Sequence, residues 1–417
     1  MNDIEQRRLW ILAIVLLIGS IVFVATRTSP SSTQTAAVPL VVPLPANEIL
    51  FDPNAPPLPL APPGTAEWAM EGLNPARTRA SATALALPLR SQRQIGTASL
   101  DEAGSPPVVA RGLALIELKD RLQAVELATG RERWSFDYRG LYVSPAVSGD
   151  MAYVRVEANN QGQLIALNLD DGTQVWSFTP RRLSRADTGY FGGHLTSPVI
   201  VDGMVIIGAG QEVYALDALD GQVRWEFATQ DLITSSAAVA DGQIYISDFR
   251  FTYAIDQANG TMVWSRPMAS AIYFAPVVTD QSLLVSSGDR LIVLARSDGR
   301  ELWSAGIEGQ TLIPAGAQGN HAFIKSNETL YAYNLTSGEQ LWQYHNINFV
   351  SLPAVAGDQA FVVSGLSGNT ELVALDIATG ASIWAQPLRS LAPTAPIIAG
   401  QTVYVRTTDG QVVSLWQ

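Results

Sequence analysis

Residues that could carry out chemistry are few in this sequence and lie far apart. The 417-residue chain has no cysteine and only three histidines, His194, His321 and His345. Without cysteine there is no disulfide, thiol nucleophile, zinc ribbon or iron–sulfur ligation. No pair of histidines has the spacing of a metal site. We therefore interpret the histidines as core or surface residues, and we expect no catalytic residue, no metal site and no bound cofactor.

Acidic and amide side chains recur at one position, a few residues before a glycine. Their regular placement favours a structural role, because the side-chain oxygens can accept backbone N–H groups two or three residues on. The glycine can adopt positive φ. Six of the seven copies carry such a residue and Ala295 stands in the other; the six are Glu126, Asn168, Asp217, Asp256, Asn334 and Asp376.

Composition excludes several classes of protein. Charged residues make up 15% of the chain, against about 25% in typical soluble domains. The 33 glycines, 24 prolines and 47% hydrophobic content argue against disorder, a coiled coil or a helical bundle. The net charge is −12 and no basic stripe is present. We therefore expect no nucleic-acid partner.

The N-terminal part predicts a membrane anchor followed by a spacer. Residues 9–25 form an uncharged apolar run between Arg8 and Arg27, and a helix of this length extends roughly 26 Å. The flanking arginines favour a cytoplasmic N-terminus, with the remainder on the extracytoplasmic side. A cleaved signal peptide is the alternative. We assign 1–28 to a single-pass signal-anchor helix in the lipid bilayer and 29–65 to a proline-rich linker.

A glycine followed four residues later by tryptophan organises the rest of the chain. The spacings between successive tryptophans are 42, 49, 39, 39, 39 and 42 residues, which suit a four-stranded propeller blade. Alternating β-branched residues with Asp-Gly turns favour strands over a helical repeat. The seven residues, interpreted as docking tryptophans between blades, are Trp134, Trp176, Trp225, Trp264, Trp303, Trp342 and Trp384.

A short apolar strand, usually opened by proline, starts each repeat, and there are eight such starts. The eighth unit ends at Gln417 with only three strands and no Gly-x-x-x-Trp. We predict that residues 85–95 supply its fourth strand and close the ring, since closure removes an exposed sheet edge. The predicted fold is all-β, an eight-bladed β-propeller.

The repeat resembles that of a known family. Ala374 to Trp384 is similar to the A-x-D-x-x-T-G-x-x-x-W turn of the pyrroloquinoline-quinone (PQQ) type β-propellers, and Trp68 to Thr78 is similar to the lead-in of those proteins. The resemblance covers residues 66–417 and implies that each tryptophan packs between neighbouring blades.

Two functional branches share that fold. One contains PQQ- and calcium-dependent dehydrogenases of alcohols or sugars, which commonly carry a vicinal disulfide. The other is non-catalytic and includes BamB, a scaffold in outer-membrane assembly. The absence of cysteine and of an assignable calcium cluster favours a BamB-like scaffold that binds an envelope or membrane protein. A quinoprotein dehydrogenase stays the alternative, and the lipidated cysteine of BamB is not present here.

One insertion suggests where a partner binds. Pro145 and Pro198 are 53 residues apart, about 14 more than most neighbouring repeats. Arginine and aromatic residues are enriched at interface hot spots, and a solvated loop without a role is the plainer interpretation. The predicted partner-binding residues are Arg181, Arg182, Arg185, Tyr190, Phe191 and His194 of the insertion, with Tyr142, Tyr273 and Phe349 ahead of other inner strands.

Overall fold

The structure is a computed structural model that describes residues 67–81, 83–96, 104–118, 120–138, 143–158, 161–181, 196–346, 348–366 and 368–417. This described part consists of strands, turns and connections and contains no α-helix. The predicted anchor at 9–25 and the linker at 29–65 lie outside it. Within it, no helix has the length and apolar character needed to cross a bilayer.

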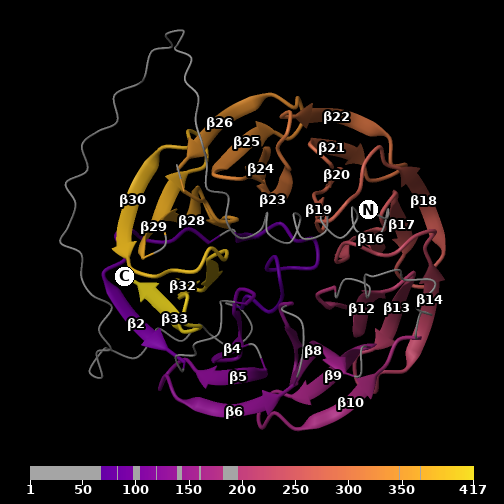
Figure 1. The fold of residues 1–417 in the computed structure, drawn as a ribbon, viewed down its shortest axis with the longest axis horizontal. Helices are drawn as coiled ribbons and strands as arrows, with labels where there is room; N and C mark the ends of the chain where they lie inside the picture. Colours follow the sequence, from indigo (N-terminus) through magenta and orange to yellow (C-terminus); the bar gives the residue numbers. More distant parts are fainter. Residues whose placement is uncertain are drawn as a thin grey trace, which may run out of the picture. The chain divides into compact units, whose positions relative to one another are not determined.

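Eight sheets stand around a central axis, each with its first strand innermost (Figure 1). The predicted eight-bladed all-β propeller is therefore confirmed. Blades 1 to 4 contain β3 (Val108–Ala110), β4 (Leu113–Glu117), β5 (Arg121–Glu126) and β6 (Glu132–Asp137); β7 (Ala146–Ser148), β8 (Met151–Ala158), β9 (Gln161–Asn168) and β10 (Gln174–Phe178); β11 (Val199–Val201), β12 (Met204–Ala209), β13 (Glu212–Asp217) and β14 (Val223–Ala228); and β15 (Ala238–Ala240), β16 (Gln243–Ser247), β17 (Phe251–Asp256) and β18 (Met262–Pro267).

The remaining blades follow the same antiparallel order. Blades 5 to 8 contain β19 (Val277–Val278), β20 (Ser282–Ser287), β21 (Arg290–Ala295) and β22 (Glu301–Gly306); β23 (Ile313–Gln318), β24 (His321–Ser326), β25 (Thr329–Asn334) and β26 (Gln340–His345); β27 (Ala354–Ala356), β28 (Gln359–Leu366), β29 (Asn369–Asp376) and β30 (Ser382–Leu388); and β31 (Ile397–Ala399), β32 (Thr402–Arg406) and β33 (Val412–Trp416).

The two faces of the disc carry different connections. One face holds the turns between the second and third strands of each blade, together with the connections between blades; we call it the connection face. The other holds the remaining two turns of each blade, and we call it the turn face. The naming follows from the antiparallel strand order within each sheet.

Blades 1 to 6 are each fastened to the next blade by the indole of the outer strand. Trp264, for example, donates its indole N–H to the carbonyl of Arg296 in the next blade, at 2.8 Å. Six of the seven tryptophans make this bond. The bonds run from Trp134 to Leu169, Trp176 to Ala218, Trp225 to Gln257, Trp264 to Arg296, Trp303 to Leu335 and Trp342 to Ile377.

The repeat glycine is required because the tryptophan ring of the preceding blade lies directly against it. A Cβ at Gly299 would lie 2.7 Å from a ring carbon of Trp264, and φ at Gly299 is +70°. Both the space and the backbone conformation exclude a side chain. The turn residue Asp376 acts as expected, because its Oδ1 accepts the N–H groups of Ala378 and Thr379.

The ring closes with an N-terminal strand, as predicted. The strand β2 (Ser91–Ile95) pairs antiparallel with β33, with Ser91 opposite Trp416 and Ile95 opposite Val412. Figure 1 shows indigo β2 beside yellow β33. Arg93 is paired with Ser414 and donates to the carbonyls of Ala128 and Thr129 in blade 1, both at 2.8 Å. An arginine thus fastens the closing interface where the other blades use tryptophan.

The lead-in, residues 67–81, lies along the inner strands of the ring. Its backbone carbonyls accept N–H groups from six of the eight inner strands, and its end, β1 (Ala80–Ser81), pairs parallel with β27. The donors are Val109, Val147, Val239, Val278, Ala317 and Val355, and the acceptors, in the same order, are Trp68, Ala69, Pro75, Ala76, Thr78 and Arg79. This segment therefore links blades that do not touch one another.

The proline of blade 6 does not come directly before its inner strand, as the proline does in blades 1, 2, 3, 5, 7 and 8. Pro314 lies inside β23, where the register shifts between Pro314 and Gly316. A Cβ at Gly316 would come within 2.6 Å of the carbonyl oxygen of Thr78. The bulge therefore makes room for the lead-in backbone.

We expect Trp264→Ala to lower the free energy of unfolding by about 3–5 kcal/mol, because it deletes a large buried ring and its hydrogen bond. Val263→Ala is the matched control, since Val263 is 45% exposed and Trp264 only 8% exposed; it should cost less than about 1 kcal/mol. Denaturant unfolding measures both. Equal costs would show that the indole does not hold the blades together.

Candidate functional site

The predicted partner-binding residue Arg181 follows β10 on the connection face. Its guanidinium pairs with Glu212 of the next blade, and its backbone N–H donates to the hydroxyl of Tyr214 at 3.3 Å. The side chain of Glu212 is 5% exposed, whereas that of Arg181 is 71% exposed. Arg181 therefore neutralises a buried carboxylate, and charge reversal at this residue would disturb the blade itself.

Tyr273 lies on the same face, in the connection between blades 4 and 5. It is exposed and meets Phe249 edge to face, with ring centroids 5.7 Å apart. Phe249 belongs to the turn between β16 and β17. Asp248 shapes that turn, because its Oδ1 accepts the N–H groups of Arg250 and Phe251. The hydrogen bonds of Asp248 thus fix the turn that places Phe249 against Tyr273.

Phe349 is half-buried and packs against a core cluster that includes residues of blades 7 and 8. Its backbone carbonyl accepts the N–H of Gly365 at 3.3 Å. Three of the predicted partner-binding residues are thus described. Arg181 lies in the connection between blades 2 and 3, Tyr273 in that between blades 4 and 5, and Phe349 in that between blades 6 and 7. The other members lie outside the described residues. They are Tyr142, Arg182, Arg185, Tyr190, Phe191 and His194.

Charged side chains of the lead-in gather near the axis. Glu71 pairs with Arg77 at 3.0 Å and with Arg79 at 4.0 Å. Arg77 also donates from Nε to the carbonyl of Ala237, 2.5 Å away, just before the inner strand of blade 4. Burial tends to raise the pKa of Glu71, but Arg77 and Arg79 outweigh it and lower this pKa overall. Glu71 is therefore ionised at neutral pH.

A second buried carboxyl lies between blades 8 and 1. Ser105 donates its hydroxyl to Glu117 at 2.6 Å, and the Tyr138 hydroxyl lies 3.2 Å from the other oxygen. Arg406 of blade 8 donates to the backbone carbonyls of Ser105 and Glu117. Burial is the largest cause that raises the pKa of Glu117, to about 7. The closing interface thus contains a group that titrates near neutral pH.

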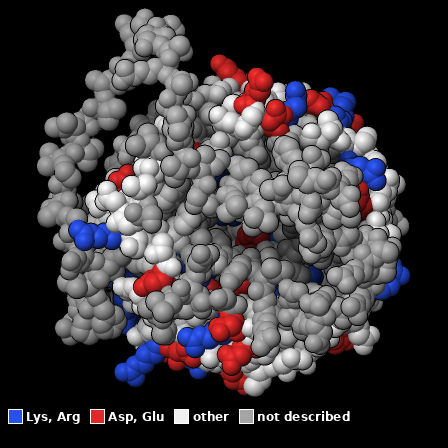
Figure 2. Space-filling view, in the orientation of Figure 1, with Lys and Arg blue, Asp and Glu red and all other residues white. Residues whose placement is uncertain are grey.

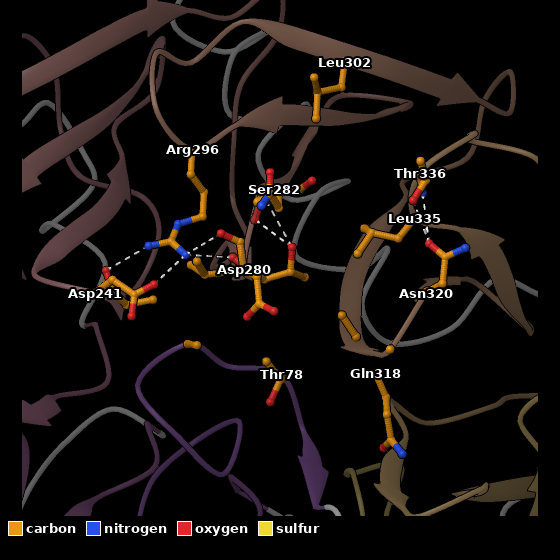
Figure 3. Close-up of a pocket in the computed structure, with 17 residues that line it drawn as sticks. Thr78, Asp241, Asp280, Ser282, Arg296, Leu302, Gln318, Asn320, Leu335 and Thr336 are labelled. Carbon is orange, nitrogen blue, oxygen red and sulfur yellow. Dashed lines mark hydrogen bonds and ion pairs between the residues drawn. The ribbon is translucent and has the colours of Figure 1, made fainter.

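A groove of about 800 Å³ opens on the turn face between blades 4, 5 and 6 (Figure 3). Arg296 spans one side of it, donating to Asp241, to the carbonyls of Thr279 and Asp280 and to the Tyr245 hydroxyl. The equivalent residue of the next blade is Leu335, which is too short to reach across in the same way. Arg296 and Leu335 therefore give the two sides of the groove different chemistry, one charged and one apolar.

The described residues do not fit the calcium–quinone centre of the enzyme branch. Calcium takes six to eight oxygen ligands, largely carboxylates and carbonyls. The axial charges described above are two guanidinium groups and one carboxylate that both of them engage. Within the described ranges, no three His, Cys, Asp or Glu side chains gather closely enough to share a metal ion.

Charge on the described surface is mixed. Figure 2 shows red and blue side chains interspersed along the rim, with no continuous basic area among the described residues of that face. This distribution agrees with the net charge of −12. It does not offer the row of cations that phosphate backbones require.

The sequence patterns did not single out Arg93, Glu117 or Arg79. Arg93 could have been noticed, because the strand predicted to close the ring carries no tryptophan. Glu117 and Arg79 carry no such signal, since their burial depends on blades distant in sequence.

Eight blades joined by docking tryptophans define the class of this protein, a β-propeller of the PQQ-repeat type. The family described as "Outer membrane protein assembly factor BamB" matches residues 78–305, 252–350 and 326–416. The chain belongs to this family.

Individual relatives match more narrowly. The outer membrane protein assembly factor BamB of Marinobacter adhaerens is 30% identical over 125 residues, which cover 30% of this chain and 29% of that protein. The match thus spans less than a third of that relative's length. A "Putative dehydrogenase XoxF" of Paracoccus denitrificans is 34% identical over 105 residues, covering 23% of this chain and 16% of that protein.

Two solved structures show the same fold. BamB from Moraxella catarrhalis has a TM-score of 0.60 at 19% identity, covering 79% of this chain and 98% of that one. Quinohemoprotein alcohol dehydrogenase from Comamonas testosteroni has a TM-score of 0.61 at 15% identity, covering 84% and 80%. At these identities the likeness concerns the fold and not the activity.

We expect the stability of the domain to fall as pH rises from about 4.5 to about 7, because folded Glu117 keeps a proton that the unfolded chain releases. Each unit of pKa shift corresponds to about 1.4 kcal/mol. Glu117→Gln should remove this contribution, and Glu339→Gln, at an exposed carboxylate, should not. Denaturant unfolding between pH 4 and 8 measures it; parallel profiles for Glu117→Gln and the parent would contradict the assignment.

Proposed function

We propose that this protein is a non-catalytic scaffold of the cell envelope, anchored by residues 1–28 and spaced from the membrane by 29–65. The propeller, 66–417, would then lie on the extracytoplasmic side and bind an envelope or membrane protein, in a BamB-like role in outer-membrane protein assembly. The observation that carries the proposal is the BamB family match, which extends from residue 78 to residue 416.

The connection face is the proposed partner surface. Its support is the exposed ring of Tyr273, which meets the half-buried ring of Phe249, together with the arginine-rich and aromatic insertion after Arg181. Exposed aromatic rings and planar guanidinium groups supply large contact area and directed donors. A partner segment that is acidic or extended would suit these groups in a chain whose net charge is −12.

We expect the double variant Arg182→Glu/Arg185→Glu to reduce partner recovery at least about tenfold, since reversed charges repel an acidic segment. Arg181 is left intact because Glu212 depends on it. The full chain is captured with its partner from its own membrane fraction, and thermal unfolding is measured in parallel. Arg300→Glu is the control, because Arg300 lies on the turn face with its side chain 68% exposed. Equal recovery from both variants would reject the connection face as the partner surface.

The quinoprotein dehydrogenase is the second candidate, favoured by the 105-residue sequence match to the "Putative dehydrogenase XoxF" at 34% identity. PQQ when bound would supply two-electron oxidation of an alcohol or sugar. The described axis, however, offers guanidinium groups in place of calcium ligands.

We expect purified protein supplied with PQQ and Ca²⁺ to show no dye-linked oxidation of methanol, ethanol or glucose, because no cluster of calcium ligands is found among the described residues. A known quinoprotein assayed in parallel is the positive control. Oxidation that depends on both PQQ and Ca²⁺ would make the enzyme the better assignment.

A further inference from the structure

The axial cluster Glu71–Arg77–Arg79 holds more positive than negative charge. Both arginines are nearly buried, at 4% and 6% exposure. Within the described ranges, the carboxylate of Glu71 raises the pKa of Arg79, and the neighbouring Arg77 lowers it. Two guanidinium groups therefore share a single ionised carboxylate. Buried charge without a counter-charge is costly, so one more negative group is needed for balance.

The hydrogen bonds of Arg77 leave one nitrogen unused. Its Nε bonds to the Ala237 carbonyl, and its Nη1 lies 3.0 Å from Glu71 Oε2. Its Nη2 is buried and has no hydrogen-bond acceptor within the part of the chain that the structure describes. A buried guanidinium nitrogen normally has an acceptor.

Arg79 is held only loosely by its described partner. Its ion pair to Glu71 Oε1, at 4.0 Å, is longer than a hydrogen bond. Burial, with Arg77 acting in the same direction, lowers its pKa despite the opposing effect of Glu71. An additional anion beside Arg79 would oppose this lowering of the pKa.

The backbone also indicates that these side chains are needed. Arg77 and Arg79 have φ values of +58° and +54°, in the left-handed region that glycine occupies with least strain. The lead-in forms its bonds to the inner strands through backbone atoms, which glycine would supply equally well. The arginine side chains therefore do something that the lead-in backbone does not.

The cluster is placed on the side of the lead-in toward the connection face. The lead-in backbone bonds to the middle of the inner strands, at Val147 and Val239 for example. The side chains of Glu71 and Arg77 instead reach Ser197 and Ala237, which precede the inner strands of blades 3 and 4. They thus extend from the lead-in toward the start of the inner strands.

We propose that Arg77 and Arg79 form an axial site for one oxyanion, a carboxylate or a phosphate. The planar guanidinium group presents paired N–H donors that match both anions. The anion would accept from Arg77 Nη2 and from Arg79 and would neutralise the excess charge. Either a free small anion or the acidic side chain of a peptide segment has this chemistry, and neither Arg77 nor Arg79 is among the predicted partner-binding residues.

The test is calorimetric titration and thermal unfolding of the full chain with sodium phosphate, sodium citrate and a pentaglutamate peptide, against sodium chloride at equal ionic strength. We expect saturable binding and a higher melting temperature with at least one oxyanion. Binding of phosphate or citrate indicates a free anion, and binding of the peptide alone indicates an acidic side chain. No binding of any of the three would overturn the proposal.

Three variants test whether the axial arginines bind the oxyanion. Arg79→Gln should weaken binding about tenfold or more, because it removes a charged donor. Glu71→Gln should strengthen binding, since it removes the competing carboxylate, and it keeps the test decisive where Arg79→Gln fails to fold. Arg296→Gln is the control, because Arg296 is also buried but its donors are used by Asp241 and by backbone carbonyls. Equal affinity in the parent, Arg79→Gln and Glu71→Gln would place the anion elsewhere.

Discussion

The contact between a tryptophan ring and the glycine of the next blade is the constraint on which the rest of the propeller depends. A Cβ at Gly172, Gly221 or Gly260 would lie within 2.6 Å of the ring in front of it, so neither partner can change alone. The same indole donates its N–H across the interface, for example from Trp225 to Gln257 at 2.9 Å. One residue pair therefore sets both the packing distance and the rotation between neighbouring blades. Blades 2 to 6 each carry one half of two such pairs, so each of them depends on both neighbours.

Two features complete what the repeat cannot supply. At the seam, Arg93 replaces the indole and bonds to the same kind of turn carbonyls in blade 1. Along the axis, the lead-in bonds its backbone to six inner strands. Backbone bonding of this kind needs no particular side chains, which leaves Glu71, Arg77 and Arg79 available for another purpose. The seam and the lead-in therefore combine structural closure with buried charged groups.

The fold was largely predictable, because a short-range sequence pattern that repeats many times specifies it. The Gly-x-x-x-Trp spacing and the eight apolar starts specify strands, turns and blade number without knowledge of long-range contacts. Blade closure by residues 85–95 followed from the missing fourth strand of the last unit.

The candidate site was less predictable. The prediction for Arg181 did not include its partner Glu212, which lies in another blade, and the prediction for Tyr273 did not include Phe249.

By itself, the sequence determined the class of the protein, its blade count, the identity of the interlocking residues and the absence of thiol chemistry, since each depends on local spacing or on composition. Only the tertiary structure decided that Arg93 takes the place of a tryptophan and that burial raises the pKa of Glu117 to about 7. It also decided that Arg77 and Arg79 share one carboxylate at the axis. Burial and charge balance arise from groups that lie far apart in the chain and meet only when the ring closes, so no local pattern carries them.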